Sequence, residues 1–155
     1  MRKLLWVSLF CFTAWAQKYD GPRPPKKDVI YLVHADNLVP TETADAKDDS
    51  KKDEAVYSVP GANSPARTPV AEPIFLIQSE KVSAEGLELY RFDVKNGRRE
   101  ITLSSKRRSG PKALHLSVTR LDRGLYRVEA AEPLENGEYV LSPSGSNQVF
   151  CFAIY

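Results

Sequence analysis

The chain has 155 residues and a formal net charge of +2, from 22 lysines and arginines against 20 aspartates and glutamates. A chain this close to neutral lacks the overall positive charge that draws proteins to nucleic acids, so no nucleic-acid partner is expected. With 2 histidines and 2 cysteines, scattered in the sequence, few ligands remain for a metal ion, and neither a metal nor a cofactor is predicted.

The amino terminus has the three parts of a secretory signal peptide. Arg2 and Lys3 are positively charged, residues 4–13 are uncharged and largely apolar, and Ala14 and Ala16 provide the small side chains of a cleavage site. The apolar stretch is well short of the roughly 20 residues that span a bilayer. We therefore predict that residues 1–16 are removed, that no transmembrane segment remains, and that the protein is secreted or periplasmic.

Cleavage would also change the composition of the protein. Trp6, Trp15 and Cys11 would be lost, which leaves no tryptophan and Cys151 as the single cysteine. One cysteine cannot form an internal disulfide, and an exported domain without disulfides suits a bacterial envelope. Because Cys151 lies between two phenylalanines, a packed and inert thiol is predicted, with a reactive thiol as the alternative.

Residues 17–28 are rich in proline and lysine and predict an extended leader rather than a packed element. The remainder, residues 29–155, is expected to form a single domain. Its first strand is predicted over residues 29–33, where β-forming apolar side chains follow one another without interruption.

The next segment is unusually polar. Residues 41–54 offer little apolar surface to offset the entropy lost on ordering, so they predict a flexible, solvated loop. A short strand is expected over residues 56–59. The proline-rich segment 60–73 excludes a helix, and residues 74–78 predict a buried strand.

Residues 87–95 and 98–104 flank Asn96-Gly97, the strongest short signal for a β-hairpin, because its turn needs positive φ at both central positions. The two-residue turn sets the register and gathers the apolar side chains on one face. The predicted cross-strand pairs are Phe92 with Ile101 and Tyr90 with Leu103.

A second hairpin is predicted from residues 114–121 and 125–131, with Gly124 at a left-handed position of the turn. Its register sets Val118 opposite Val128 and Leu116 opposite Ala130. A third hairpin is predicted from residues 138–141 and 148–154.

The whole pattern predicts an all-β fold. We expect an antiparallel β-sandwich of about eight or nine short strands, with a long polar loop near the amino terminus, because half-apolar strands bury their apolar faces against a second sheet.

The run Leu134-Glu135-Asn136-Gly137-Glu138-Tyr139 resembles the start of the penultimate strand in immunoglobulin-like and fibronectin-III-like sandwiches. This resemblance implies an immunoglobulin-like sandwich in which the Tyr139 hydroxyl bonds back to the chain just upstream, with residues 148–154 as the closing strand. The chain departs from antibody-type domains, because it has no cysteine pair and no core tryptophan. It is also similar to secreted bacterial domains of unassigned function, which implies no activity.

Residues suited to catalysis are few. His34, with Asp36 nearby at the end of a predicted strand, is the better candidate for a general base, whereas His115 alternates with leucines and predicts an exposed position. A hydrolase would also need an activated nucleophile, and the sequence contains no G-x-S-x-G run. A small secreted hydrolase using His34 and Asp36 is therefore an alternative and not the main prediction.

Seven basic residues lie close together in the sequence, and they predict a positive patch if the Asn96-Gly97 hairpin tip and the loop after it project together. Such a patch would bind an acidic glycan or lipopolysaccharide by releasing counterions; otherwise these residues only solubilise a turn. The residues are Lys95, Arg98, Arg99, Lys106, Arg107, Arg108 and Lys112. A carbohydrate-binding domain is a further alternative, with Tyr19, Tyr57 and Tyr155 as the exposed aromatic candidates.

An export signal, a β-rich core and the lack of reactive constellations together predict a non-catalytic module. We expect an exported domain with an interaction or structural role in a bacterial envelope or secretome, whose partner is another envelope or secreted protein. The loops between residues 41 and 73 are the predicted contact surface, since loops on a rigid sandwich commonly carry recognition.

Overall fold

The structure is a computed structural model, and it describes residues 18–51, 54–104 and 111–155. The predicted signal peptide, residues 1–16, lies outside the described residues. Within the described part the regular elements are all β-strands, β1 to β14, so the all-β prediction is confirmed and the expected strand number was too low.

The strands form three sheets. Sheet A has the order β11 (Leu116–Asp122), β12 (Leu125–Ala130), β7 (Ile74–Gln78), β1 (Ile30–His34) and β2 (Asn37–Pro40). Sheet B has the order β3 (Glu42–Asp45), β14 (Gln148–Ile154), β13 (Gly137–Pro143) and β8 (Leu87–Arg91), and β6 (Arg67–Thr68) runs parallel to the end of β14. Sheet C has the order β4 (Lys47–Asp48), β5 (Glu54–Pro60), β10 (Arg98–Ser104) and β9 (Asp93–Lys95).

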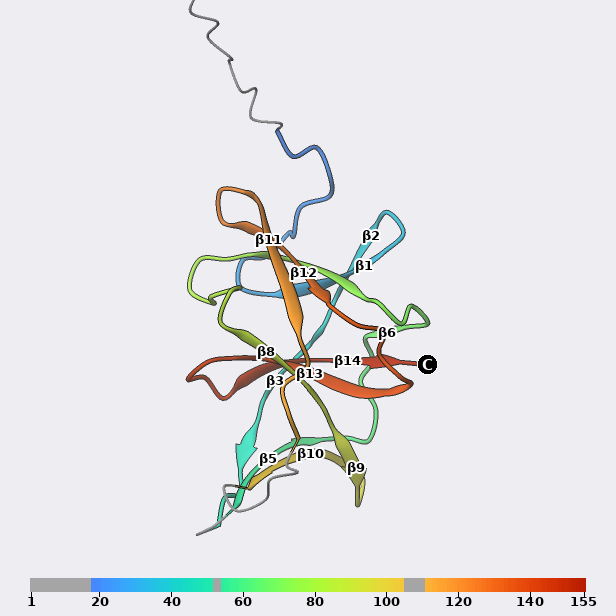
Figure 1. The fold of residues 1–155 in the computed structure, drawn as a ribbon, viewed down its shortest axis with the longest axis vertical. Coiled ribbons are helices and arrows are strands. Elements are labelled where there is room, and N and C mark those ends of the chain that lie inside the picture. The colour runs from blue at the N-terminus through green and yellow to red at the C-terminus, as the bar shows by residue number, and fades with distance from the viewer. Residues whose placement is uncertain (1–17, 52–53, 105–110) are drawn as a thin grey trace, which may run out of the picture.

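Sheet B lies between the other two sheets, with sheet A above it and sheet C below it in Figure 1. Its strand β14 alternates between two cores. Phe150 and Phe152 pack against sheet A, whereas Val149 and Cys151 pack against sheet C. The described strands therefore form three stacked sheets, one more than the predicted two-layer sandwich needs, because the central strands are apolar on both faces.

Two of the three predicted hairpins are confirmed. Strands β11 and β12 pair with Leu116 opposite Ala130 and Val118 opposite Val128, as predicted, and a register shift between Arg120 and Asp122 accommodates the turn. Strands β13 and β14 pair antiparallel around residues 144–147. The predicted strands over residues 29–33, 56–59 and 74–78 correspond to β1, β5 and β7.

The hairpin at Asn96-Gly97 is confirmed at its turn and wrong beyond it. Asn96 and Gly97 have φ of 52° and 73°, and β9 pairs with β10 from Lys95 opposite Arg98 to Asp93 opposite Glu100. The chain then leaves sheet C, because the Phe92 N–H donates to Glu138 O at 2.8 Å and β8 pairs with β13. Strand β10 pairs instead with β5 along its whole length.

The loop predicted over residues 41–54 is wrong at residues 42–45 and 47–48, which form β3 and β4, and residues 52–53 of it lie outside the described residues. Long-range pairing with β14 and β5 orders residues whose own composition predicts no strand. The proline-rich segment 60–73 contains no helix, as predicted, but it is not a free loop. Ser64, Ala66 and Thr68 are buried, and β6 joins sheet B.

The resemblance implied a hydrogen bond from the Tyr139 hydroxyl to the chain just upstream, the contact called a tyrosine corner, and this bond is present. The Tyr139 hydroxyl donates to the carbonyl of Glu135 at 2.8 Å, and the ring of Tyr139 stacks on Phe152 with centroids 5.5 Å apart. This contact and the antiparallel sheets are compatible with a β-sandwich.

Candidate functional site

Sheets B and C enclose a cleft of about 390 Å³. Strand β8 shows how its wall is built. Leu87 and Leu89 point into the core against sheet A, and alternation therefore turns Glu88 and Tyr90 toward sheet C, where both line the cleft. The same alternation on β13 places Val140 and Ser142 on the cleft side.

The floor of the cleft is apolar and comes from both sheets. Its side chains belong to the smaller of the two cores, between sheets B and C. Many of these side chains are small, so the two sheets meet without filling the space at one end. The buried floor residues are Ala46, Phe92, Ile101, Val140 and Val149.

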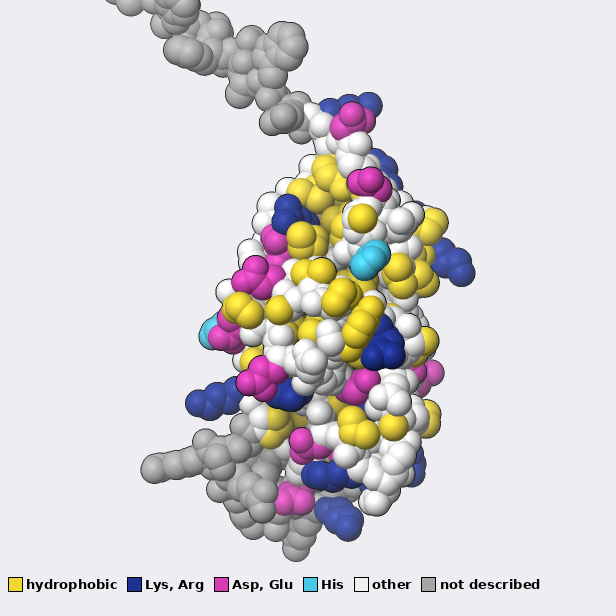
Figure 2. Space-filling view, turned by 90° about the vertical axis from the view of Figure 1, so that its right-hand side faces the viewer, with side chains coloured by type: hydrophobic (Ala, Val, Ile, Leu, Met, Phe, Trp, Pro, Cys, Tyr) yellow, Lys and Arg dark blue, Asp and Glu magenta, His cyan; other side chains and the backbone are white. Residues whose placement is uncertain are grey.

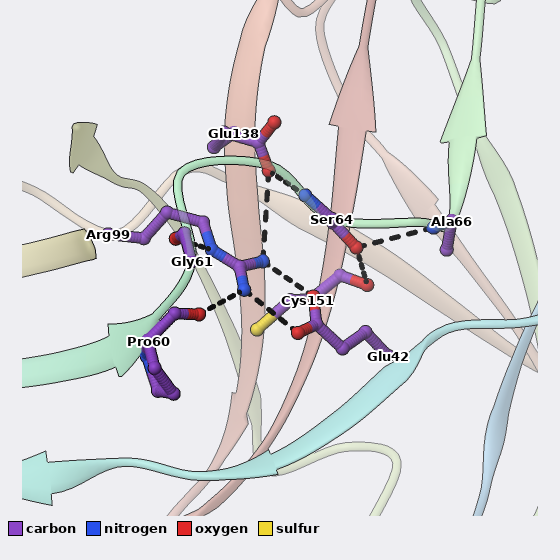
Figure 3. A network of polar contacts seen from close by, with 8 residues as sticks. All are labelled: Glu42, Pro60, Gly61, Ser64, Ala66, Arg99, Glu138 and Cys151. Carbon is purple, nitrogen blue, oxygen red and sulfur yellow. Dashed lines mark hydrogen bonds and ion pairs between the residues drawn. The ribbon is translucent and has the colours of Figure 1, made fainter. Parts of the chain in front are cut away.

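The other end of the interface between sheets B and C is closed by Arg99, whose side chain is buried although it lies next to the turn at Asn96-Gly97. Figure 3 shows the guanidinium reaching from β10 toward Glu42 on β3 and Glu138 on β13. Arg99, Ile101 and Leu103 alternate onto the same side of β10, so the ion pair lies on the same inner surface as the cleft.

Arg99 makes several polar contacts. Its Nη1 and Nη2 donate to the two carboxylate oxygens of Glu42 at 2.6 and 2.8 Å. Its Nε donates to the carbonyl of Gly61 at 3.0 Å, and Nη2 also donates to the carbonyl of Pro60 at 3.0 Å. This bidentate pair with two backbone acceptors is the arrangement that compensates a buried guanidinium for lost water.

The two glutamates beside Arg99 are affected in opposite directions. Burial alone would raise the pKa of Glu42, but the hydrogen bonds and charge of Arg99 outweigh it and lower that pKa. Burial raises the pKa of Glu138, and the Ser64 N–H at 2.9 Å and the more distant Arg99, 3.8 Å away, do not offset it. The Arg99 guanidinium therefore stabilises the ionised form of Glu42 more strongly than that of Glu138.

Cys151 lies beside this network and is packed in the core, as predicted. Its side chain is fully buried, and burial raises the pKa of its thiol to about 12. Since the thiolate is the reactive form, this environment suppresses nucleophilic chemistry. Its carbonyl accepts a hydrogen bond from the Ser64 hydroxyl at 3.2 Å, which ties the proline-rich segment to β14 (Figure 3).

Polar groups gather at the open end of the cleft. The Tyr90 hydroxyl donates to Glu88 Oε2 at 3.0 Å, and burial followed by this contact raises the pKa of Tyr90. The turn between β13 and β14, residues 144–147, completes the rim with small polar side chains and backbone. An apolar floor with a few polar groups at its edge is the usual composition of a small-molecule site.

The predicted polyanion patch is wrong at Arg99, which is buried and paired, and hence not part of the surface. Lys95 and Arg98 are exposed, but each pairs with acids: Lys95 with Asp93 at 3.3 Å, and Arg98 with Glu100 at 3.1 Å. Figure 2 likewise shows basic and acidic side chains intermixed at the lower end of the molecule, where sheet C lies. Lys112 is exposed, and the remaining predicted members lie outside the described residues: Lys106, Arg107 and Arg108.

Neither histidine candidate lines this cleft. His34 and Asp36 are exposed at the turn between β1 and β2, at the opposite end of the molecule from sheet C (Figure 1). His115 is also exposed. Within the described residues no cluster of three or more His, Cys, Asp or Glu side chains is arranged to hold a metal ion. The described part also has no helix that is long and apolar enough to cross a membrane.

The aromatic candidates for carbohydrate binding are not brought together. Tyr155 is exposed and lies under Arg67 at 4.5 Å, Tyr19 is half-buried near Arg23, and Tyr57 lines the cleft. Of the three, Tyr57 alone belongs to the candidate site.

Sequence reasoning missed Glu88 and Glu42, although a signal for Glu88 exists. Tyr90 and Phe92 were predicted on one apolar face, and residue 88 has the same parity on that strand, so the acid falls on the inner surface. Glu42 gives no such signal, because its strand forms only through pairing with β14.

Comparisons with known proteins assign no family. No family model matches the chain, and neither does any curated protein or any solved structure.

Proposed function

We propose that this chain is an exported, non-catalytic binding domain whose cleft between sheets B and C receives the apolar part of a small ligand. The observation that carries the proposal is the cleft of about 390 Å³ with its apolar floor and polar rim. This volume lies within the range of about 300–1,000 Å³ that small-molecule sites occupy. The predicted signal peptide supports an exported, envelope or secreted location.

The rigid surroundings of the cleft favour binding over catalysis. The Arg99 pair holds sheet C against sheet B at one end, so the cleft at the other end is preformed. The one cysteine beside it is buried, with a strongly raised pKa, and supplies no nucleophile. A protein partner or an acidic glycan is less favoured, because strands β3 to β6 occupy part of the segment predicted to contact it, and Lys95, Arg98 and Arg99 pair with acids.

The tyrosine corner supports a narrower proposal about the fold. Sheets A and B would correspond to the two layers of an immunoglobulin-like sandwich, with β14 as its closing strand, and sheet C would be an addition to it.

The binding proposal is tested with a neutral apolar probe, naphthylethanol, titrated calorimetrically into the purified protein. Ser142→Phe should fill the cleft and lower probe affinity at least about tenfold, while the free energy of unfolding changes by less than about 1 kcal/mol. Ser117→Phe is the matched control, because Ser117 is exposed on β11 of sheet A. Equal binding by both variants, or no binding by the unaltered protein, would overturn the proposal.

Export is tested on the intact mass of the protein recovered outside the cytosol. Cleavage after residue 16 would give a chain that begins at Gln17 and shows no tryptophan emission, because Trp6 and Trp15 would be gone. A chain that retains Met1 and tryptophan fluorescence would contradict this part of the proposal.

A further inference from the structure

The geometry points to a ligand that joins an apolar body to a positively charged amine, with Glu88 at the edge of the cleft receiving the ammonium group. This inference rests on the proposed function, since it concerns the ligand of the same cleft. It adds the chemical class of that ligand.

Charge complementarity is the first argument. Of the described residues that line the cleft, Glu88 alone has a charged side chain, and the others are apolar or neutral. Glu88 is exposed, so its charge is partly screened by water, but a single acid at the edge of an apolar cavity still attracts a cation and repels an anion. A ligand with a carboxylate or phosphate would therefore be disfavoured here.

The orientation of Glu88 is the second argument. Glu88 lies opposite Ser142 in the pairing of β8 with β13, and Tyr90 lies two residues further on the same face of β8. The Tyr90 hydroxyl donates to Glu88 Oε2 at 3.0 Å, which holds the carboxylate at the edge of the cleft, and within the described part of the chain no side chain bonds Oε1. The raised pKa of Tyr90 keeps this hydroxyl protonated at neutral pH, so it acts as a donor and adds no second negative charge.

The aromatic lining is the third argument. Tyr57, Tyr90 and Phe92 all line the cleft, and they come from both sheets. Aromatic faces attract cations, and they also pack against apolar groups. Ile101 and Val140 complete the floor against which an aliphatic or aromatic body would pack.

The test compares three probes of nearly the same shape: naphthylethylamine, naphthylethanol and naphthylacetate. We expect the unaltered protein to bind the amine about fivefold more tightly than the alcohol, the size of a solvent-exposed ion pair, and the acetate most weakly. The preference for the amine should shrink as salt is added, because exposed charges are screened.

Glu88→Gln should abolish the preference for the amine, so that the affinities for naphthylethylamine and naphthylethanol differ by less than about twofold. The glutamine keeps the shape of the side chain and an oxygen that can accept from Tyr90. Glu85→Gln is the matched control, since Glu85 is an exposed acid three residues away that does not line the cleft. It should retain the preference.

The outcomes separate the two proposals. If the amine and the alcohol bind equally, if the acetate binds best, or if Glu88→Gln retains the preference, the ligand class is wrong while the binding function stands. If none of the three probes binds, both proposals are wrong. Loss of the preference in Glu88→Gln alone would support the inference.

Discussion

The two faces of sheet B are built differently, although they share the same strands. Toward sheet A, large apolar side chains close the interface: Phe75 meets Phe152 edge-on with ring centroids 4.8 Å apart, and the ring of Tyr139 stacks on Phe152. Toward sheet C, the buried side chains are mostly small, and a buried arginine pair fills one end. The first interface is closed by packing alone, and the second combines a charged contact with unfilled space.

This difference suits the interface between sheets A and B to stability and the interface between sheets B and C to binding. Large rings fill volume completely and gain dispersion energy at every surface, so an interface made from them leaves little room for a ligand. Small side chains such as Ala46 and Val140 leave space between the sheets, and a specific contact must then hold the sheets in position. Arg99 with Glu42 supplies that contact.

The largest expected effect is on the face toward sheet A. Phe152→Ala should lower the free energy of unfolding by about 4 kcal/mol, because it removes a fully buried ring and leaves a cavity beside Phe75 and Tyr139. Cys151→Ala, one residue away on the opposite face, should cost only about 1 kcal/mol. Urea unfolding measures both, and equal losses would contradict the contrast between the two faces.

Arg99→Met should lower the free energy of unfolding by about 3 kcal/mol at neutral pH, because it leaves the half-buried Glu42 and the buried Glu138 without their cation. The loss should be smaller near pH 5, where protonation neutralises carboxylates whose pKa has risen in the absence of Arg99. Arg98→Met is the control: its side chain is exposed, and the change should cost less than about 1 kcal/mol. A loss that does not depend on pH would indicate lost packing and not lost charge.

Tyr139→Phe should lower the free energy of unfolding by about 1 kcal/mol, since it removes the hydroxyl that donates to the Glu135 carbonyl and keeps the stacked ring. Thermal unfolding at one fixed pH is sufficient to measure it. Probe binding should be unaffected, because Tyr139 faces sheet A and not the cleft. A change in probe affinity would show that the two faces of sheet B are coupled.

Glu138→Gln should have the smallest effect, and its sign should depend on pH. The folded-state pKa of Glu138 is raised, so the stability linked to its protonation is present below its unfolded pKa of about 4.3 and is lost as pH rises through the folded value. The neutral variant should therefore gain stability relative to the unaltered protein on going from pH 4 to pH 7.

Glu42→Gln should behave oppositely, because the lowered pKa of Glu42 contributes stability above about pH 4.3 that is lost in acid. Unfolding midpoints of both variants, measured from pH 4 to pH 7, test this difference. The same dependence on pH in both variants would contradict the unequal stabilisation of the two carboxylates by Arg99.

Local features of the fold follow from short stretches of sequence. The turn at Asn96-Gly97 and the positive φ of Gly124 were predictable, because few other residues tolerate those backbone angles. The register of β11 with β12 follows from its turn and from alternating side chains, and the Tyr139 hydrogen bond was implied by the resemblance of residues 134–139 to immunoglobulin-like sandwiches. These features depend on contacts within about 20 residues of chain, where propensity and alternation decide.

Tertiary structure alone decided which strands became neighbours. Tyr90, Phe92, Ile101 and Leu103 do gather in one apolar cluster, as the alternation predicts, but they do so across two sheets and not across one hairpin. Arg99 resembles any surface arginine in the sequence, and only the approach of β3 and β13 makes it a buried anchor. Alternation determines which side chains share a face of a strand, whereas the partner of that face depends on pairing between distant segments, and no local pattern encodes it.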